Sequence, residues 1–213
     1  MIHYHVFTFN PFQENTYLLW NDQKTAWIID PGCINQEEQE ELNSFIIKEG
    51  LSVEKVLLTH SHIDHVLGLS FCQKNWKIDA WNHPLDASTF DAIPQYAPTY
   101  GMPYKEGNKP LNKLEHNQNI FLGEENFEVR FVPGHAPGHV VFIHHEQKLI
   151  LGGDVLFRGS VGRTDLPGGD SDILKKSIRS EIYSLKDNYT IFPGHGPETN
   201  VFFEKENNPF VKA

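Results

Sequence analysis

The order of apolar and polar positions predicts that the chain begins with strands. Residues 2–9, 16–20 and 26–30 are rich in β-branched, aromatic and other apolar side chains, and the turn-forming stretches N-P-F-Q-E-N and N-D-Q-K separate them. A further apolar strand is expected from Val53 to Thr59. This succession is typical of hairpins that form part of a sheet.

A helix is expected between the third and fourth of these strands. Asn35 is a typical N-cap residue, acidic side chains fill the first turns, and Gly50 is a typical stop signal. Leu42 and Ile46, with Phe45 beside them, give this helix a narrow apolar face.

The second half repeats the order of strands followed by a helix. We expect strands at 77–81, 127–133, 139–145, 148–154 and 188–195, and helices at 66–75 and 171–186. Residues 84–118, with a short helix near the start, are rich in Pro, Gly and polar residues, and so long a connection is usually functional or mobile. Two sheets packed face to face, with helices outside, accommodate this duplicated order in a single domain over residues 1–213.

Composition narrows the functional classes. The formal net charge of −10 argues against nucleic-acid binding, which requires a basic surface. The N-terminus does not resemble a signal peptide, and no apolar run is long enough for a membrane span. Only two cysteines occur, so we expect no disulfide framework and a cytoplasmic location. The sequence leaves the oligomeric state open, a homo-oligomer included.

Twelve histidines are unusual in a chain of this length, and several follow predicted strands. The segments T-H-S-H-I-D-H, V-P-G-H, L-G-G-D and F-P-G-H each end an apolar run on potential metal ligands. Ligands at strand ends can converge at one edge of a sheet, and a preceding glycine lets the backbone approach closely. Imidazole together with carboxylate suits zinc, iron or manganese better than calcium or magnesium.

These motifs, in this order, resemble those of the metallo-β-lactamase superfamily. T-H-S-H-I-D-H is similar to its H-x-H-x-D-H signature, while N-P-F-Q-E-N-T-Y-L-L and I-I-D-P-G resemble its glyoxalase II-like branch. The resemblance implies a four-layer αββα sandwich of the α/β class with two divalent metal ions, zinc being expected ahead of iron or manganese. The short stretch after His195 predicts that the C-terminal glutathione-binding helical domain of glyoxalase II is absent.

The resemblance also implies roles for seven residues. The first metal would be bound by His60, His62 and His135, the second by Asp64, His65 and His195, and Asp154 would bridge them. Asp64 and Asp154 are also the candidate catalytic residues. The implied activity is hydrolysis of a small-molecule thioester of the S-lactoylglutathione kind, or of a related ester, by a metal-bridging hydroxide. A thiolate, with a parent pKa near ~8.5, leaves without a dedicated general acid.

Other residues have two interpretations each. Asp30 either orients a ligand imidazole or accepts hydrogen bonds from turn amides, and His139 either supports the ligands or is simply buried. The remaining histidines lack the context of a ligand and are expected to lie on the surface or to be satisfied by neighbours: His3, His5, His83, His116, His144 and His145.

Substrate contacts are less defined. Arg163, in G-R-T-D, could bind a substrate carboxylate or pair with Asp165 or Asp170, and the internal pair is preferred. Phe12 lies in a loop that related enzymes use as a flap, and Tyr100 and Tyr104 are similar candidates. Three lysines of the long connection could form a basic lip or a solvated loop: Lys105, Lys109 and Lys113.

Two alternatives remain open at this stage. G-R-T-D also occurs in persulfide dioxygenases, in which one iron would be bound by His60, His135 and Asp154. The following L-P-G-G-D favours the hydrolases. A lactonase is the further alternative, because the same nucleophile attacks ester carbonyls.

Overall fold

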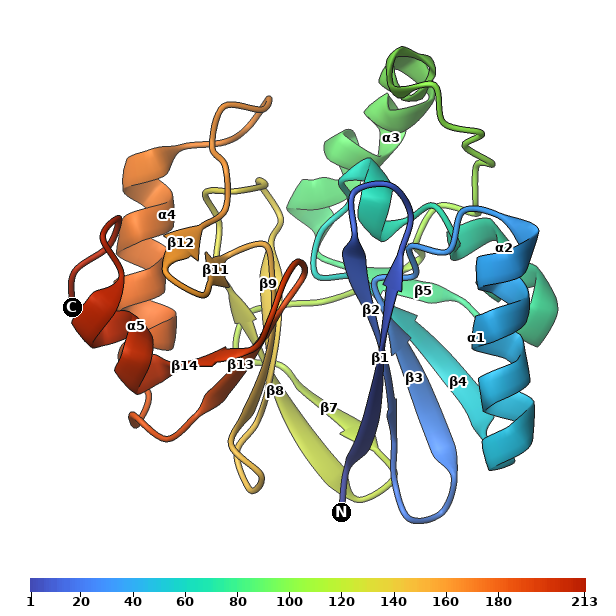
Figure 1. The fold of residues 1–213 in the computed structure, drawn as a ribbon, viewed down its shortest axis with the longest axis horizontal. Coiled ribbons are helices and arrows are strands. Elements are labelled where there is room, and N and C mark those ends of the chain that lie inside the picture. The colour runs from blue at the N-terminus through green and yellow to red at the C-terminus, as the bar shows by residue number, and fades with distance from the viewer.

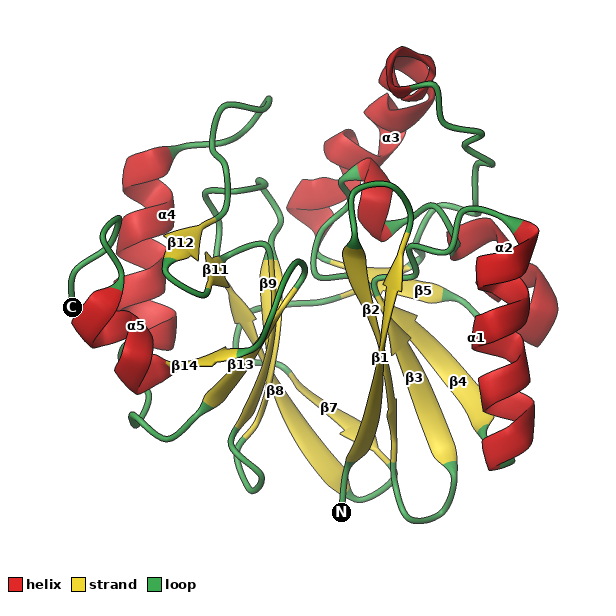
Figure 2. Ribbon diagram, in the orientation of Figure 1, coloured by secondary structure: helices red, strands yellow, loops and turns green.

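The computed structural model describes residues 1–213 and contains four layers: helices, two six-stranded sheets, and helices again (Figures 1 and 2). The first sheet has the strand order β1-β2-β3-β4-β5-β6. Its strands are β1 (His3–Phe9), β2 (Glu14–Trp20), β3 (Thr25–Ile29), β4 (Ser52–Leu57), β5 (Ala80–Asn82) and β6 (Asn112–Lys113). The predicted αββα architecture is confirmed.

The second sheet is built from the second half of the chain, in the order β14-β13-β10-β9-β8-β7. Its strands are β7 (Asn119–Leu122), β8 (Glu125–Phe131), β9 (Val140–His144), β10 (Leu149–Gly153), β13 (Thr190–Pro193) and β14 (Thr199–Asn200). A separate two-stranded ribbon is formed by β11 (Leu156–Phe157) and β12 (Ser160–Val161). The duplicated order read from the sequence therefore corresponds to one sheet from each half.

Helices cover the outer face of each sheet. On the first sheet lie α1 (Gln36–Glu49) and α2 (Leu69–Trp76), while α3 (Ala87–Tyr96) lies beyond its upper end in Figure 1. On the second sheet lie α4 (Ser171–Ser177), which continues as one π-helical segment to Ile182, and α5 (Val201–Asn207). Short 3₁₀ turns occur at Ile63–His65, Pro84–Asp86 and Ala97–Tyr100. None of the helices is both long and apolar enough to span a bilayer.

Alternation along the strands explains the layers. Leu18 and Ile28 pack outward against α1, whereas Leu19 and Trp27, one residue away, face the second sheet. Three separate apolar clusters result: one beneath α1 and α2, one between the sheets, and one beneath α4 and α5. Each layer interface thus has its own core, because strand side chains point alternately to opposite faces.

Local signals set the ends of α1 as predicted. The Asn35 side chain accepts a hydrogen bond from the Glu38 amide at 3.0 Å, and Gly50 adopts the left-handed conformation with φ of 65°. Leu42 and Ile46 are buried, while Phe45 is partly buried. These contacts fix α1 against the first sheet.

The differences from the predicted elements concern weak signals. The strand expected at 77–81 is Ala80–Asn82, and the helix expected at 66–75 begins only at Leu69 after a 3₁₀ turn. The two-residue β6, the four-residue β7, and the terminal β14 with α5 were not foreseen, because short elements carry little periodicity. The short helix expected near the start of residues 84–118 is α3.

A buried phenylalanine between the sheets should be essential for stability. Replacing fully buried Phe142 by alanine should lower the free energy of unfolding by about 3–5 kcal/mol, because both lost transfer energy and a cavity contribute. Urea denaturation measures this. The matched control is Phe121→Ala on the edge strand β7, where the side chain is 53% exposed and the loss should stay below about 1 kcal/mol. Equal losses would contradict the assignment of the central core.

Candidate metal centre

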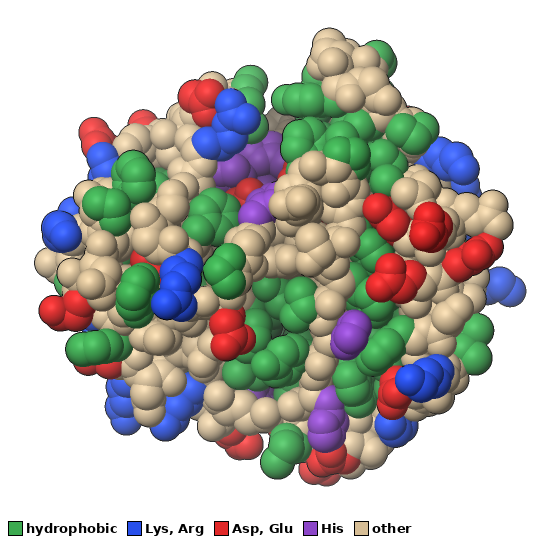
Figure 3. Space-filling view, in the orientation of Figure 1, with side chains coloured by type: hydrophobic (Ala, Val, Ile, Leu, Met, Phe, Trp, Pro, Cys, Tyr) green, Lys and Arg blue, Asp and Glu red, His purple; other side chains and the backbone are tan.

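The structure brings the seven expected metal ligands together at one end of the two sheets. They follow four strands: His60, His62, Asp64 and His65 after β4, His135 after β8, Asp154 after β10, and His195 after β13. In the space-filling view, histidine side chains lie at the bottom of a surface hollow between an apolar wall and a cluster of charged side chains (Figure 3). Strands from both halves of the chain therefore contribute to one site.

The first group consists of three imidazoles whose potential ligand atoms lie within 4.8 Å of one another: His60, His62 and His135. The distance from His62 Nδ1 to His135 Nε2 is 2.8 Å, and the distance from His60 Nε2 to His135 Nε2 is 3.2 Å. This matches the set expected for the first metal.

Oxygen acceptors determine which nitrogen of these imidazoles carries a proton. Thr59 Oγ1 donates its hydrogen to Asp30, so at 3.0 Å from His60 Nδ1 it can only accept from that nitrogen. The Arg163 carbonyl similarly accepts from His135 Nδ1 at 2.8 Å. The Nε2 atoms of His60 and His135 then face each other with lone pairs.

Two lone pairs at 3.2 Å repel each other unless a cation lies between them. Burial lowers the pKa of His60 well below its usual value and that of His62 to about 3, so both imidazoles are neutral near pH 7. Burial also lowers the pKa of His135. The group therefore has the protonation state that metal binding requires.

The second group, Asp64, His65 and His195, combines a carboxylate with two imidazoles. His195 Nε2 lies 3.1 Å from Asp64 Oδ2, and His65 Nε2 lies 3.6 Å from it. Main-chain oxygens of Phe12 and Gln13 accept from His195 Nδ1 at 3.1 and 3.2 Å, which leaves His195 Nε2 directed at the carboxylates.

Asp154 lies between the two groups. Its Oδ1 is 3.5 Å from His65 Nε2, and its Oδ2 is 3.6 Å from both His135 Nε2 and His195 Nε2. Burial alone would raise the pKa of Asp154, but His65 lowers it well below its usual range, so the carboxylate is ionised. Asp154 Oδ1 and His65 Nε2 are buried without a hydrogen-bond partner, and a divalent cation would satisfy both.

Asp30 performs both roles that the sequence left open. Its Oδ1 accepts from the Thr59 amide at 2.7 Å, and its Oδ2 accepts from Thr59 Oγ1 at 2.6 Å and from His65 Nδ1 at 3.2 Å. Because one carboxylate holds both Thr59 and His65, it orients an imidazole in each group. Such contacts fix the tautomer and the orientation of a metal ligand.

His139 supports the site without joining it. Its Nε2 accepts from the Asp154 amide at 3.0 Å, and its ring stacks on His60 with centroids 4.7 Å apart. His139 is also fully buried, so it both supports the ligands and is a buried side chain, the two interpretations that the sequence left open.

Glycines allow this close packing, as the sequence predicted. Gly153 has φ of 48°, and a Cβ there would collide with Thr59 and His139. A Cβ on Gly194 would collide with the Asp154 carboxylate and with His65. Side chains at these two positions would displace the ligands.

The rim residues lie near the centre without joining it. Arg163 forms two hydrogen bonds of 2.7 Å with Asp165, which is the preferred internal pair, whereas Asp170 caps α4. Phe12 is 39% exposed, and its ring meets Tyr100 edge-to-face at 5.7 Å. Lys109, one of the three lysines considered for a basic lip, pairs with Asp91, so its charge is not free to attract an anionic substrate.

The other histidines have satisfied environments, as expected. One of them, His144, forms a separate group with Glu125 and Glu146, apart from the centre. His144 Nδ1 accepts from the Gln147 amide at 3.2 Å, so its proton lies on Nε2, which donates to Glu125 at 2.9 Å. With no free lone pair on either nitrogen, His144 is not set up to bind a metal. The others are held by hydrogen bonds or by ring stacking. The hydrogen-bonded ones are His3 with Asp22, His116 with the Phe131 amide, and His145 with Glu128, and the stacked ones are His5 on Phe45 and His83 on Phe131.

Sequence reasoning missed several residues that hold the ligands. Thr59 links Asp30 to His60, and Asn10 Nδ2 donates to the carbonyls of Gly32 and Asp64 at 3.0 and 3.1 Å. Glu14 is fully buried, and its Oε1 lies 3.9 Å from His65 Nδ1. Burial raises the pKa of the Glu14 carboxyl well above its usual value. The position of Thr59 directly before His60 was the one available signal.

Replacing Asp30 by asparagine should weaken metal binding while preserving the fold. The amide would place an N–H group near Thr59 or His65, where an acceptor is needed, so metal affinity should fall about 10–100-fold. Competition with a chromogenic chelator measures this. Asp22→Asn, at an exposed carboxylate that pairs with His3, is the matched control and should leave affinity unchanged. Unchanged affinity in the Asp30 variant would refute the orienting role.

Comparisons with known proteins agree with this geometry. Hydroxyacylglutathione hydrolase GloC of Haemophilus influenzae is 39% identical over 204 residues, which cover 95% of this chain and 94% of the relative. The crystal structure of BLEG-1 B3 metallo-beta-lactamase matches with a TM-score of 0.90 at 31% identity, covering 99% of this chain and all of the other.

The structure of TTHA1623 in a di-iron-bound form matches with a TM-score of 0.87 at 35% identity, covering 97% of this chain and all of the other. The family model of the metallo-beta-lactamase superfamily matches residues 9–195. The chain therefore belongs to the metallo-beta-lactamase superfamily and is a metallo-hydrolase.

Proposed function

We propose that the protein is a dinuclear metallo-hydrolase that cleaves a thioester of the S-lactoylglutathione kind or a related small ester. The observation that carries this proposal is the position of Asp154, whose two oxygens reach members of both ligand groups. A bridging carboxylate is needed only where two ions are bound side by side.

The relatives support the same reading. The Haemophilus relative is named a hydroxyacylglutathione hydrolase, and the TTHA1623 structure is described as di-iron-bound. Zinc is our first expectation for this chain, since its ligand set of imidazoles and carboxylates suits zinc, with iron or manganese as the alternatives.

The chain's own residues prepare the site for this chemistry. Divalent ions held here would supply Lewis acidity, which makes water a nucleophile at neutral pH and polarises a carbonyl. Asp64 and Asp154 supply two negative charges that offset half of the charge of two such ions, and the neutral imidazoles of the first group add ligands without charge. The buried hydrogen bonds of Asp30 and Thr59 keep these ligands oriented.

A thioester suits the groups around the centre. Arg163 on the rim pairs with Asp165 and has no proton to give at neutral pH. A leaving thiolate, with a parent pKa near ~8.5, needs no acid, whereas an amide nitrogen does. A lactone would meet the same requirement, so lactones belong in the substrate panel.

One preparation of purified enzyme can test the proposal. We expect about two metal ions per chain by mass spectrometry and metal-dependent cleavage of S-lactoylglutathione or of simpler thioesters. One iron per chain, with thiol-dependent oxygen uptake and no thioester cleavage, would instead establish the persulfide dioxygenase alternative, with His60, His135 and Asp154 as ligands. Preferential lactone cleavage would favour the lactonase.

Variants in the second group should separate the two sites. Asp64→Asn and His65→Ala should each lower the metal content from about two ions to about one, because the first group keeps its three imidazoles. Activity should fall by more than the roughly 10–100-fold cost of losing a supporting residue. Asp91→Asn and His145→Ala, both exposed and distant from the centre, are the matched controls. Two retained ions in both second-group variants would count against the dinuclear assignment.

The Arg163 side chain should contribute little to catalysis. Its guanidinium is 59% exposed and already satisfied by Asp165, so Arg163→Ala should change kcat/KM by less than about tenfold. Its carbonyl continues to hold His135, so metal content should be unchanged. Steady-state kinetics with S-lactoylglutathione and a neutral thioester measure the effect. A large rise in KM for the anionic thioester alone would show instead that Arg163 binds a substrate carboxylate.

A further inference from the structure

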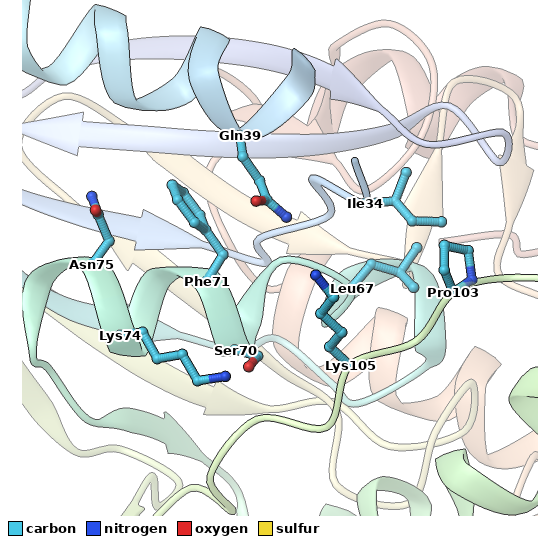
Figure 4. Close-up of a pocket in the computed structure, with 9 residues that line it drawn as sticks. All are labelled: Ile34, Gln39, Leu67, Ser70, Phe71, Lys74, Asn75, Pro103 and Lys105. Atoms are coloured by element: carbon cyan, nitrogen blue, oxygen red, sulfur yellow. The ribbon is translucent and has the colours of Figure 1, made fainter. Parts of the chain in front are cut away.

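A cavity of about 320 Å³ lies on the outer helical layer of the first sheet, apart from the metal centre (Figure 4). It is open to solvent on one side and is lined by residues of α1, of α2 and of the segments before α1, before α2 and after α3, and none of these residues is a ligand of either metal group. We propose that this cavity binds a small organic anion with an apolar body, such as a carboxylate attached to an aliphatic or aromatic group. The proposal is independent of the hydrolase activity.

The walls of the cavity are fixed by hydrogen bonds and core packing. Gln73 on α2 donates to the Asn108 carbonyl at 2.9 Å and accepts from the Asn108 amide at 2.7 Å. Met102 and Tyr104 pack against the apolar cluster of the first sheet, while the alternate residues Pro103 and Lys105 line the cavity. The segment is thus held in place on both sides of Lys105.

The charge of the cavity favours an anion. Lys74 from α2 and Lys105 from the opposite wall both line it, and no carboxylate lies within ion-pair distance of either amine. By contrast, Lys109 in the same segment is neutralised by Asp91. No acidic residue lines the cavity, in a chain whose formal net charge is −10. The two lysines therefore create a local positive potential in an otherwise negative protein.

Neutral polar groups complete the recognition surface. Ser70 is only 3% exposed and lines the cavity. It lies in the first turn of the eight-residue helix α2, and the N-terminal end of a helix favours negative charge. Figure 4 shows Gln39 reaching in from α1 and Lys105 reaching in from the facing segment.

Apolar side chains indicate the rest of the ligand. Ile34, Leu67 and Phe71 form one side, and Pro103 forms part of the other. Small-molecule sites combine such apolar walls with a few polar groups that fix orientation, and the volume lies at the lower end of their usual range, roughly 300–1,000 Å³. Bare phosphate would leave these walls without a partner, so an amphipathic anion fits better.

Calorimetric titration of the metal-loaded protein with 3-phenylpropionate tests the proposal. We expect saturable 1:1 binding that weakens several-fold between about 0.05 and 0.5 M salt, because screening acts on the two exposed amines. The neutral analogue 3-phenylpropanol should bind at least about tenfold more weakly. The double variant Lys74→Ala/Lys105→Ala should raise Kd at least about tenfold. These exposed substitutions leave the core intact, and circular dichroism verifies folding.

The matched control is Lys48→Ala/Lys176→Ala, which removes the same charge from other helices. It should keep the wild-type Kd. Absence of saturable 3-phenylpropionate binding would overturn the proposal, and so would equal Kd values for the two double variants or for the acid and the alcohol. Hydrolysis of a neutral thioester, which a basic lip would not affect, should be equal in the Lys74/Lys105 variant and the control, so failure here would be distinct from failure of the hydrolase assignment.

Discussion

The crowding of imidazole lone pairs and carboxylates in one buried place is the constraint on which the structure depends. His60 Nε2 and His135 Nε2 face each other at 3.2 Å, and Asp154 presents an unpartnered oxygen beside them. Such an arrangement is repulsive by itself, so rigid contacts must hold it and cations must stabilise it. The main-chain carbonyls that accept from Nδ1 supply part of that rigidity, because each fixes both the ring orientation and the free nitrogen.

The two-sheet architecture tolerates this crowding because other residues stabilise the fold. The ligands extend from the ends of strands whose side chains fill three separate apolar clusters, so the centre contributes little to the cores that stabilise the fold. Glycines at 153 and 194 then allow neighbouring backbones to approach where any Cβ would collide with a ligand or its support. Stability and chemistry are thereby assigned to different residues, as in many enzymes that carry their sites at strand ends.

Sequence predicted the parts that depend on local patterns. The long strands and α1 followed from alternation and capping, and the ligands followed from motifs that end apolar runs on histidine or aspartate. The only signal for Thr59 was its place directly before His60. Asn10 and Glu14 could not be predicted, because their contacts join segments far apart in the chain. Neither could the carbonyl of Arg163, since a main-chain acceptor leaves no trace in residue type. The same limit applies to α5 and β14, which are too short for periodicity to identify.

The rim of the metal centre is exposed, whereas the ligands at its base are buried and held by hydrogen bonds. His60 and His65 are fully buried and are held by Thr59 and Asp30, whereas the Phe12 and Tyr100 side chains are exposed and contact each other edge-to-face. Exposed side chains can change without loss of the core, so we expect the buried ligands to set the reaction type and the exposed rim to set the choice of substrate. A family assignment therefore transfers to the metal ligands with more force than to the substrate, because the scaffold constrains exposed side chains least.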